Sequence, residues 1–582
     1  MKLKKLTALL LSVAVTVSLL VGCGGSGETG KSQTSAETTD AATTTTTESS
    51  STETAAVEEK TSYSEDEITD FTMFITNPGS EINDDNEIAQ IIAEKWGVRV
   101  KETWLTGQTA AEATGTLIAS DEYPDFIDSD EMGLLYEAGA LIPLDEYIDK
   151  YPEFKEKWFT EEEWEKFRMP DGHIYWINPF GNSKGESTTT THNDEAFWIQ
   201  VRVLEWAGYP EINTMDEYFQ VIEDYIAANP AMEDGTPNLA YTILCEDWRY
   251  FCLENAGQFL AGYPNDGSVL VDKETMTIGD YNTSEDTIKY LKKLNEEYKK
   301  GFVDPESFTQ TYDEYIAKLS TGRVLGMVDQ WWDFAYTVND VFKQQGLDQQ
   351  GCNYVPLGLT TEEGMENRWH TYDDTVNQAS GIAITVDCKD PEKAFEFLVD
   401  CAMDQELHDL RFWGVQDVDY KVDEAGLFYR TDEQRMNWAD TAYQASHRCQ
   451  YSYFPQWHGT SDDGINANKP EEQASEFQLD MAQPLKDCLA AYDARNYVDM
   501  IGSVVEKNGP WFPMYSYSNN FTTETPGGVA WAKMGEIKHE WLPKVVMAED
   551  FDATWAEYME AYNACKPEDF LAEMQAILDG FK

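Results

Sequence analysis

The stretch FTMFITNPG at residues 71–79 decides the fold prediction, because it begins a regular alternation of strands and helices. FTMFI has the length and the aromatic and aliphatic composition of a buried strand, and NPG is a turn signal. Apolar residues then recur at helical spacing from Ile88 to Trp96, and Gly97 follows as a helix end. VRV at residues 98–100 indicates a second strand. This part of the chain therefore predicts a strand, a helix and a strand in that order.

The alternation continues with a helix at residues 111–120 and a third strand, DFI, at residues 125–127. Strands separated by helices indicate a parallel sheet with right-handed crossovers, so we predict an α/β fold. The pattern returns later as a helix capped by Thr283 or Ser284 and ended by Gly301, strands at 324–328 and 382–386, and a helix opened by Asp390 and Pro391. Residues 424–483 show no clear pattern, and the sequence predicts no role for them.

The composition is strongly acidic. The 582 residues include 107 acidic and 42 basic side chains, for a formal net charge of −65. Binding to nucleic acid or to an anionic membrane surface requires clustered Lys and Arg, so this charge argues against both partners. Clustered arginines would favour an anionic ligand, and the sequence shows few of them. Aromatic residues make up 13% of the chain, with 18 Trp, which is enough to fill a core and leave rings for stacking on a ligand.

The first 62 residues predict secretion and tethering. Three lysines in residues 1–5 precede sixteen uncharged residues, 6–21, which is typical of a signal peptide and shorter than the ~20 residues of a membrane-spanning helix. The sequence LVGC ending at Cys23 resembles the lipobox of bacterial lipoproteins, in which cleavage leaves a lipid-bearing (palmitate) cysteine. We therefore expect a signal peptide at 1–22, and a lipidated cysteine with a disordered Ser/Thr-rich tether at 23–62.

No motif predicts catalysis, a cofactor or a metal site. Neither HExxH nor GxSxG occurs, and the seven His are scattered. The segment SDDG at residues 461–464 does not match the spacing of an EF-hand calcium loop. The eight cysteines after Cys23 form no CxxC pair, which argues against zinc-ribbon and thioredoxin-like sites. We expect these eight to be mostly buried free thiols, and we expect no catalytic residues.

Seven motifs occur along most of the mature chain: YPDFID with LLYEAGALIPLDEY (123–147), DGHIY (171–175), EAFWI (195–199), and the segments 204–221, 290–305, 322–332 and 381–400. In this order they resemble the extracellular solute-binding proteins of carbohydrate ABC transporters, the group that includes maltose-binding protein. No single motif is diagnostic, and their shared order carries the resemblance. The chain is longer than maltose-binding protein, and residues from Glu424 on have no convincing match.

The resemblance implies a two-lobed, periplasmic-binding-protein-like α/β fold of type II, with discontinuous lobes joined by a hinge. The first lobe is expected at 63–190 with 375–415, and the second at 191–374 with 416–582. It also implies a monomer that is lipid-anchored at the outer face of a bacterial cell membrane, and that delivers a carbohydrate to the permease subunits of an ABC importer by cleft closure. Two alternatives remain open: a surface enzyme that degrades glycans, and a binding protein for peptides or another non-sugar solute.

Sugar recognition needs aromatic planes for the faces of the ring and polar side chains for its hydroxyls. By the family pattern, Trp332 after strand 324–328 is the expected stacking ring, with Trp331 as a second candidate. Glu195 and Trp198 lie on the segment that resembles a crossing between lobes. Packing in the core is the alternative role for each ring, and capping of backbone amides is the alternative for Glu195.

Further candidates follow from position and composition. Asp128 and Asp130 come just after the third strand, where open α/β sheets bind ligands, and helix capping is their alternative role. The remaining candidates for ligand contact are Asn77, Trp248, Arg249, Trp413, Trp457 and Trp511.

Overall fold

The computed structural model describes residues 62–582 except 181, 186–187, 193, 265, 369–375 and 503–508. The predicted signal peptide, Cys23 and the tether up to residue 61 lie outside the described residues. None of the helices that the model describes is long and apolar enough to cross a membrane.

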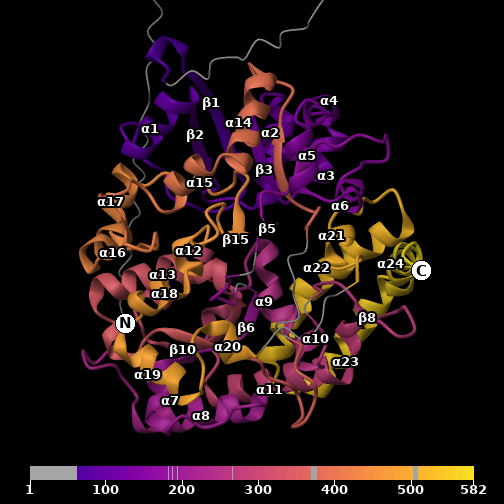
Figure 1. Cartoon of the computed structure of the whole chain (residues 1–582). Coiled ribbons are helices and arrows are strands. Elements are labelled where there is room, and N and C mark those ends of the chain that lie inside the picture. The colour runs from indigo at the N-terminus through magenta and orange to yellow at the C-terminus, as the bar shows by residue number, and fades with distance from the viewer. Residues whose placement is uncertain are drawn as a thin grey trace, which may run out of the picture. The chain divides into compact units, whose positions relative to one another are not determined.

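The first sheet has five strands in the order β2-β1-β3-β12-β4. Their bounds are β1 (Thr69–Ile75), β2 (Val98–Trp104), β3 (Phe126–Ser129), β4 (Trp176–Ile177) and β12 (Gly381–Ile384). β1 runs parallel to β2 and β3, as predicted, with Met73 opposite Phe126. β12 runs antiparallel to both β3 and β4, so the sheet is mixed rather than purely parallel. Figure 1 shows β1, β2 and β3 together in this sheet.

The second sheet has four strands in the order β11-β6-β10-β7. They are β6 (Glu195–Gln200), β7 (Leu239–Tyr241), β10 (Val324–Gln330) and β11 (Tyr354–Leu357). β6 is antiparallel to both of its neighbours, and all six of its residues are buried. The segment expected to cross between lobes is therefore a central strand of this sheet. Its burial accounts for the apolar residues of EAFWI at 195–199.

Helices in the first half of the chain are α1 (Glu87–Trp96), α2 (Ala110–Ser120), α3 (Met132–Glu137), α4 (Asp145–Ile148), α5 (Pro152–Trp158), α6 (Glu161–Lys166), α7 (Val201–Ala207), α8 (Met215–Ala228), α9 (Phe251–Glu254), α10 (Ala256–Leu260) and α11 (Glu285–Lys300). Local sequence sets their ends. The Ser284 hydroxyl accepts the backbone N–H of Thr287 at the start of α11, and Gly301 ends that helix with φ +83°. Gly97 ends α1 in the same left-handed conformation, which glycine adopts without strain.

Helices in the second half are α12 (Tyr312–Ser320), α13 (Trp331–Gln345), α14 (Pro391–Met403), α15 (Gln405–Phe412), α16 (Asp432–Ala439), α17 (Thr441–Ser446), α18 (Ala474–Asp480), α19 (Gln483–Ala491), α20 (Tyr497–Ile501), α21 (Tyr515–Ser518), α22 (Pro526–Met547), α23 (Phe551–Ala564) and α24 (Pro567–Asp579). The predicted cap of α14 is confirmed, since Asp390 accepts the backbone N–H of Lys393. α22 packs against both α23 and α24, which are the yellow helices of Figure 1.

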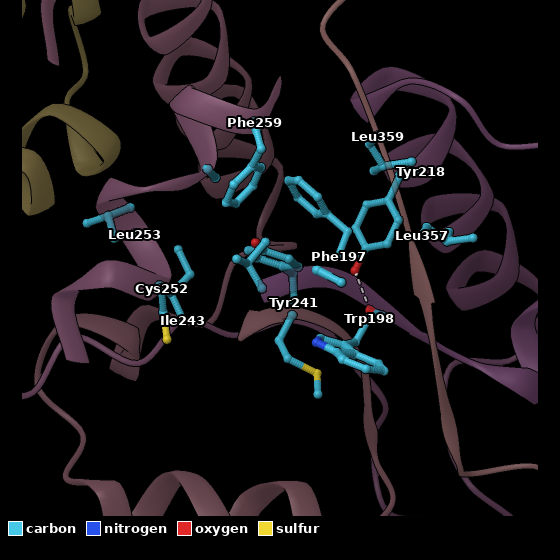
Figure 2. Packing of buried hydrophobic residues seen from close by; sticks show 14 of the residues in the cluster. Phe197, Trp198, Tyr218, Tyr241, Ile243, Cys252, Leu253, Phe259, Leu357 and Leu359 are labelled. Atoms are coloured by element: carbon cyan, nitrogen blue, oxygen red, sulfur yellow. Dashed lines mark hydrogen bonds between the residues drawn. The ribbon is translucent and has the colours of Figure 1, made fainter. Parts of the chain in front are cut away.

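Two hydrophobic cores lie against the two sheets. The first contains buried residues between Phe71 and Ile177 and between Val376 and Trp457. The second contains residues between Ala196 and Leu359 and between Met481 and Leu578. Figure 2 shows part of the second core, where the Tyr218 hydroxyl donates a hydrogen bond of 2.8 Å to the Trp198 carbonyl.

We call the chain around each core a lobe. The structure corrects one predicted boundary, since 416–582 was expected to lie wholly in the second lobe. Trp438, Tyr451 and Trp457 pack in the first core instead. The first lobe therefore extends about forty residues further, because this segment of short elements buries its aromatic residues under the first sheet.

All eight cysteines in the described part of the chain are free and buried. The expectation of mostly buried free thiols is confirmed. Burial raises the pKa of the Cys401 and Cys488 thiols to about 12, so both are protonated at neutral pH.

Candidate ligand-binding cavity

A cavity of about 1,880 Å³ is lined by residues of both lobes. Its volume exceeds the ~300–1,000 Å³ of common small-molecule sites. The chain passes between the two cores at three places among the described residues: after Ile177, after Leu359 and after Trp457. The cavity is therefore bounded by two bodies that these segments connect, an arrangement that permits hinge motion.

The carboxyl ends of the parallel strands provide one wall of the cavity. Asn77 follows β1, Glu102 and Trp104 lie at the end of β2, and Asp128 and Asp130 lie at the end of β3. Asn77, Asp128 and Asp130 were predicted from this topology, because parallel strands present their carboxyl ends at one edge of the sheet. Glu102 and Trp104 lie at the same edge of the sheet for the same reason, but the sequence analysis did not name them as candidates.

Burial changes the charge of this wall. It raises the pKa of Glu102 to about 7, and it raises the pKa of Asp130 to about 6 against the opposing effect of Arg249. The pKa of Asp128 is also well above its usual range, because the carboxyl is buried and Asp130 lies nearby. Carboxyl groups that hold a proton both donate and accept hydrogen bonds, which suits the hydroxyl groups of a neutral ligand.

Several polar atoms that line the cavity have no hydrogen-bond partner among the described residues. They are Asn77 Oδ1, Glu102 Oε1, Trp104 Nε1, Asp128 Oδ2 and Trp248 Nε1. Buried polar atoms are normally paired, since leaving one unpaired costs about 1–3 kcal/mol. All five residues line the cavity, so a polar ligand in the cavity would satisfy these atoms.

Aromatic rings of the second lobe provide the opposite wall. Trp332, in the first turn of α13 after β10, stacks on Trp248 with 5.8 Å between ring centroids and 17° between planes. Phe251 also stacks on Trp248, with 5.7 Å between the ring centroids. The Trp332 indole N–H donates to Gln330 Oε1. Trp331 also lines the cavity, but it is only 7% exposed and packs mainly in the second core.

Arg249 lies behind this wall rather than in it. Its Nε atom donates to Asp333 Oδ1 at 2.9 Å, and both side chains are at most 5% exposed. Its guanidinium carbon lies 4.2 Å from the ring centres of both Trp248 and Tyr312. Arg249 was predicted to contact the ligand, but it does not line the cavity; its guanidinium packs on the ring of Trp248, which does.

A second group of rings comes from the first lobe. Tyr453 contacts Trp104 edge-to-face at 5.6 Å and Phe180 at 5.3 Å. All three line the cavity, so rings are available on both lobes. The sequence analysis missed these rings. Trp104 could have been predicted from its position at the end of β2, whereas Tyr453 lies in the segment 424–483, where the sequence shows no clear pattern.

Five other predicted contacts lie outside the cavity. Trp198 and Trp413 are fully buried, Trp457 is 7% exposed, and each donates its indole N–H to a backbone carbonyl. Trp511 is 4% exposed in the second core. Glu195 is 1% exposed and accepts a hydrogen bond from Asn255 Nδ2 at 3.2 Å. These predictions are corrected, because the side chains pack within the lobes instead of facing the space between them.

Six of the predicted residues do meet in one place: Asn77, Asp128, Asp130, Trp248, Trp331 and Trp332. They join residues of both lobes around a cavity with aromatic faces and polar edges. A two-lobed α/β chain with such a cavity has the architecture of periplasmic-type binding proteins.

Comparison with known proteins identifies the family. The model of the bacterial extracellular solute-binding proteins matches residues 87–409, more than half of the chain, and the chain belongs to this family. A curated relative is the fructooligosaccharide ABC transporter substrate-binding protein FusA of Streptococcus pneumoniae serotype 4, which is 29% identical over 255 residues. That alignment covers 40% of this chain and 45% of FusA, about half of the relative's length.

Solved structures share the fold over nearly the whole chain. The alginate-binding protein AlgQ2 without calcium ion has a TM-score of 0.60 at 17% identity, covering 90% of this chain and 100% of AlgQ2. Streptococcus pneumoniae FusA in complex with kestose has a TM-score of 0.60 at 18% identity, covering 88% and 99%. The two-lobed α/β fold predicted from the sequence is therefore confirmed.

Proposed function

We propose that the chain is an extracellular substrate-binding lipoprotein that delivers an oligosaccharide to an ABC importer. The observation that carries this proposal is the cavity itself, where stacked Trp248 and Trp332 of the second lobe and partnerless polar atoms of the first lobe line the same space. Flat rings suit the C–H faces of sugars, and carboxyl groups suit their hydroxyls. The volume leaves room for several sugar units. The curated relative FusA carries out this type of function for fructooligosaccharides.

The proposed mechanism is reversible binding without covalent chemistry. A sugar that stacks on the rings of one lobe and bonds to the polar wall of the other stabilises the closed arrangement of the lobes. Closure removes water, so each polar contact discriminates more strongly between ligands. The permease subunits then recognise the closed protein and receive the sugar as it opens.

The proposed location follows from the N-terminal sequence, with Cys23 as the lipid-bearing residue that holds the chain at the outer face of the membrane. Replacing Cys23 by Ala should move the chain from the membrane fraction to the medium of the producing cells, because no lipid remains to anchor it. Fractionation followed by immunoblotting measures this. A variant that stays in the membrane fraction would exclude Cys23 as the anchor.

A thermal-shift screen of the purified chain against mono- and oligosaccharides, with peptides as a second panel, tests the binding function. A ligand at ~100 times its dissociation constant should add about 2.7 kcal/mol to the free energy of unfolding. We expect this response for at least one oligosaccharide and for no peptide. A response to peptides alone would reject the sugar assignment.

A further inference from the structure

Three cations from the segment 424–483 line the cavity. They are Arg430, Arg448 and Lys469. Arg430 is 6% and Lys469 5% exposed, and Arg448 is half-buried. Among the described residues, no carboxylate oxygen lies within 4.0 Å of their charged nitrogens. In a chain with 107 acidic and 42 basic residues, cations such as the buried Arg430 and Lys469 without an ion-pair partner are unexpected, since buried charges are normally paired.

Only uncharged acceptors hold the two guanidinium groups. Arg430 Nη2 donates to the carbonyls of Phe412 and Trp413 at 3.2 and 3.0 Å, and its Nε atom is buried with no hydrogen-bond partner among the described residues. Arg448 Nη1 donates to the Trp438 carbonyl at 2.7 Å. Lys469 Nζ lies 3.3 Å from Nε2 of a neighbouring imidazole, that of His458. Each cation is therefore held in position without an ion pair.

Aromatic rings fix the cations further. The guanidinium carbons of Arg430 and Arg448 lie 4.1 and 4.6 Å from the Trp438 ring centre. Lys469 Nζ lies 5.2 Å from the ring centre of Phe412, whose carbonyl Arg430 contacts. Cation–π contacts stabilise these positions without neutralising the charge. The three cations thus form one preorganised group, which we call the basic end of the cavity.

Acidic side chains lie near the basic end, but none of them forms an ion pair with its three cations. Glu476 pairs with Arg435 at 2.7 Å and also acts on Arg430, and Glu472 pairs with His458 and also acts on Lys469. Asp419 pairs with His447. Glu471 acts on all three cations without pairing, and Asp340, whose pKa burial raises to about 6, acts on Arg448. The three cations therefore lack an ion-pair partner among the described residues.

We propose that the basic end binds a singly charged oxyanion on the oligosaccharide, either the carboxylate of an acidic sugar or a sulfate ester. This inference rests on the proposed function. Guanidinium groups present N–H donors in a planar fork that fits the two oxygens of such a group. The stacked Trp248 and Trp332 then hold neutral units of the same ligand elsewhere in the cavity.

Calorimetric titration of the full-length chain with matched sugars tests the inference. The probes are a neutral oligosaccharide that passes the thermal-shift screen, the same sugar with its terminal unit oxidised at C6 to the uronic acid, and the same sugar with a C6 sulfate ester. We expect at least one acidic probe to bind ten or more times tighter than the neutral one. Tighter binding of the uronate identifies a carboxylate, and tighter binding of the sulfated sugar identifies a sulfate ester.

The variant Arg448→Gln should reduce the ratio of acidic to neutral affinity to below threefold, and Arg448→Lys should retain part of it. The matched control is Arg495→Gln, whose side chain is 83% exposed and lies outside the cavity, and which should keep the full ratio. If Arg448→Gln fails to fold, the comparison of the three probes on the wild-type chain still tests the inference. Raising NaCl from 50 to 500 mM should weaken the acidic probe several-fold and leave the neutral probe unchanged.

Equal binding of all three probes would overturn the inference and leave the proposed function intact. An unchanged ratio in folded Arg448→Gln would overturn it as well. Binding of no sugar of either kind would overturn the inference together with the proposed function.

Discussion

Replacing Trp332 by Ala is expected to weaken oligosaccharide binding by about 30-fold or more while the chain remains folded. Trp332 is partly exposed to the cavity and stacks on Trp248, so its ring is already oriented before a sugar arrives. Removal of a buried aromatic anchor from a binding site costs ~2 kcal/mol or more, and about 1.4 kcal/mol corresponds to a tenfold change in affinity. Trp332→Phe keeps a ring face and should lose less.

Isothermal titration calorimetry with the best sugar from the screen measures this effect, and circular dichroism checks the fold. Trp206→Ala is the matched control, because Trp206 is 46% exposed and does not line the cavity. We expect its affinity to equal that of the wild type. If Trp332→Ala and Trp206→Ala bind the sugar equally well, the stacking role of Trp332 is wrong.

Replacing Arg249 by Met is expected to lower the free energy of unfolding by about 3–5 kcal/mol. The change removes the ion-pair partner of Asp333, whose side chain is only 1% exposed. Burial already raises the pKa of Asp333, and Arg249 is the main influence that lowers it. Loss of the guanidinium also removes the contacts with Trp248 and Tyr312. Urea unfolding followed by tryptophan fluorescence measures the change.

The double variant Arg249→Met with Asp333→Leu should recover much of the lost stability, because no unpaired charge then remains buried. Arg495→Met is the exposed counterpart: Arg495 pairs with Asp499 at 2.8 Å on the surface, and its loss should cost less than about 1 kcal/mol. A cost for Arg249→Met as small as that of Arg495→Met would show that the buried pair does not stabilise the second lobe.

Local signals in the sequence account for the part of the fold that was predicted. Helix ends such as Ser284, Asp390 and Gly97 act through contacts within a few residues, so the sequence alone specifies them. The strand-end candidates Asp128 and Asp130 follow from the parallel pairing of β1 with its neighbours. In each case, the physical cause is either local or a direct result of the strand order.

The remaining errors have tertiary causes. Trp198 and Trp413 are tryptophans like Trp332, but both are fully buried, and each donates its indole N–H to a carbonyl far along the chain. The basic end could not be predicted from the sequence for the same reason. Arg430, Arg448 and Lys469 are separated in sequence and come together around Trp438 and Phe412. Their segment has strands of two and three residues and short helices, which leave no readable period.

The central claim is that two hinged lobes bind an intact sugar and release it unchanged. Equilibrium dialysis of the full-length chain against the best oligosaccharide, followed by mass spectrometry of the sugar recovered after unfolding the protein, tests this most directly. We predict saturable binding of one sugar per chain and recovery of a single species with its original mass. Shortened sugars, or no retention of any sugar by the folded chain, would contradict the account.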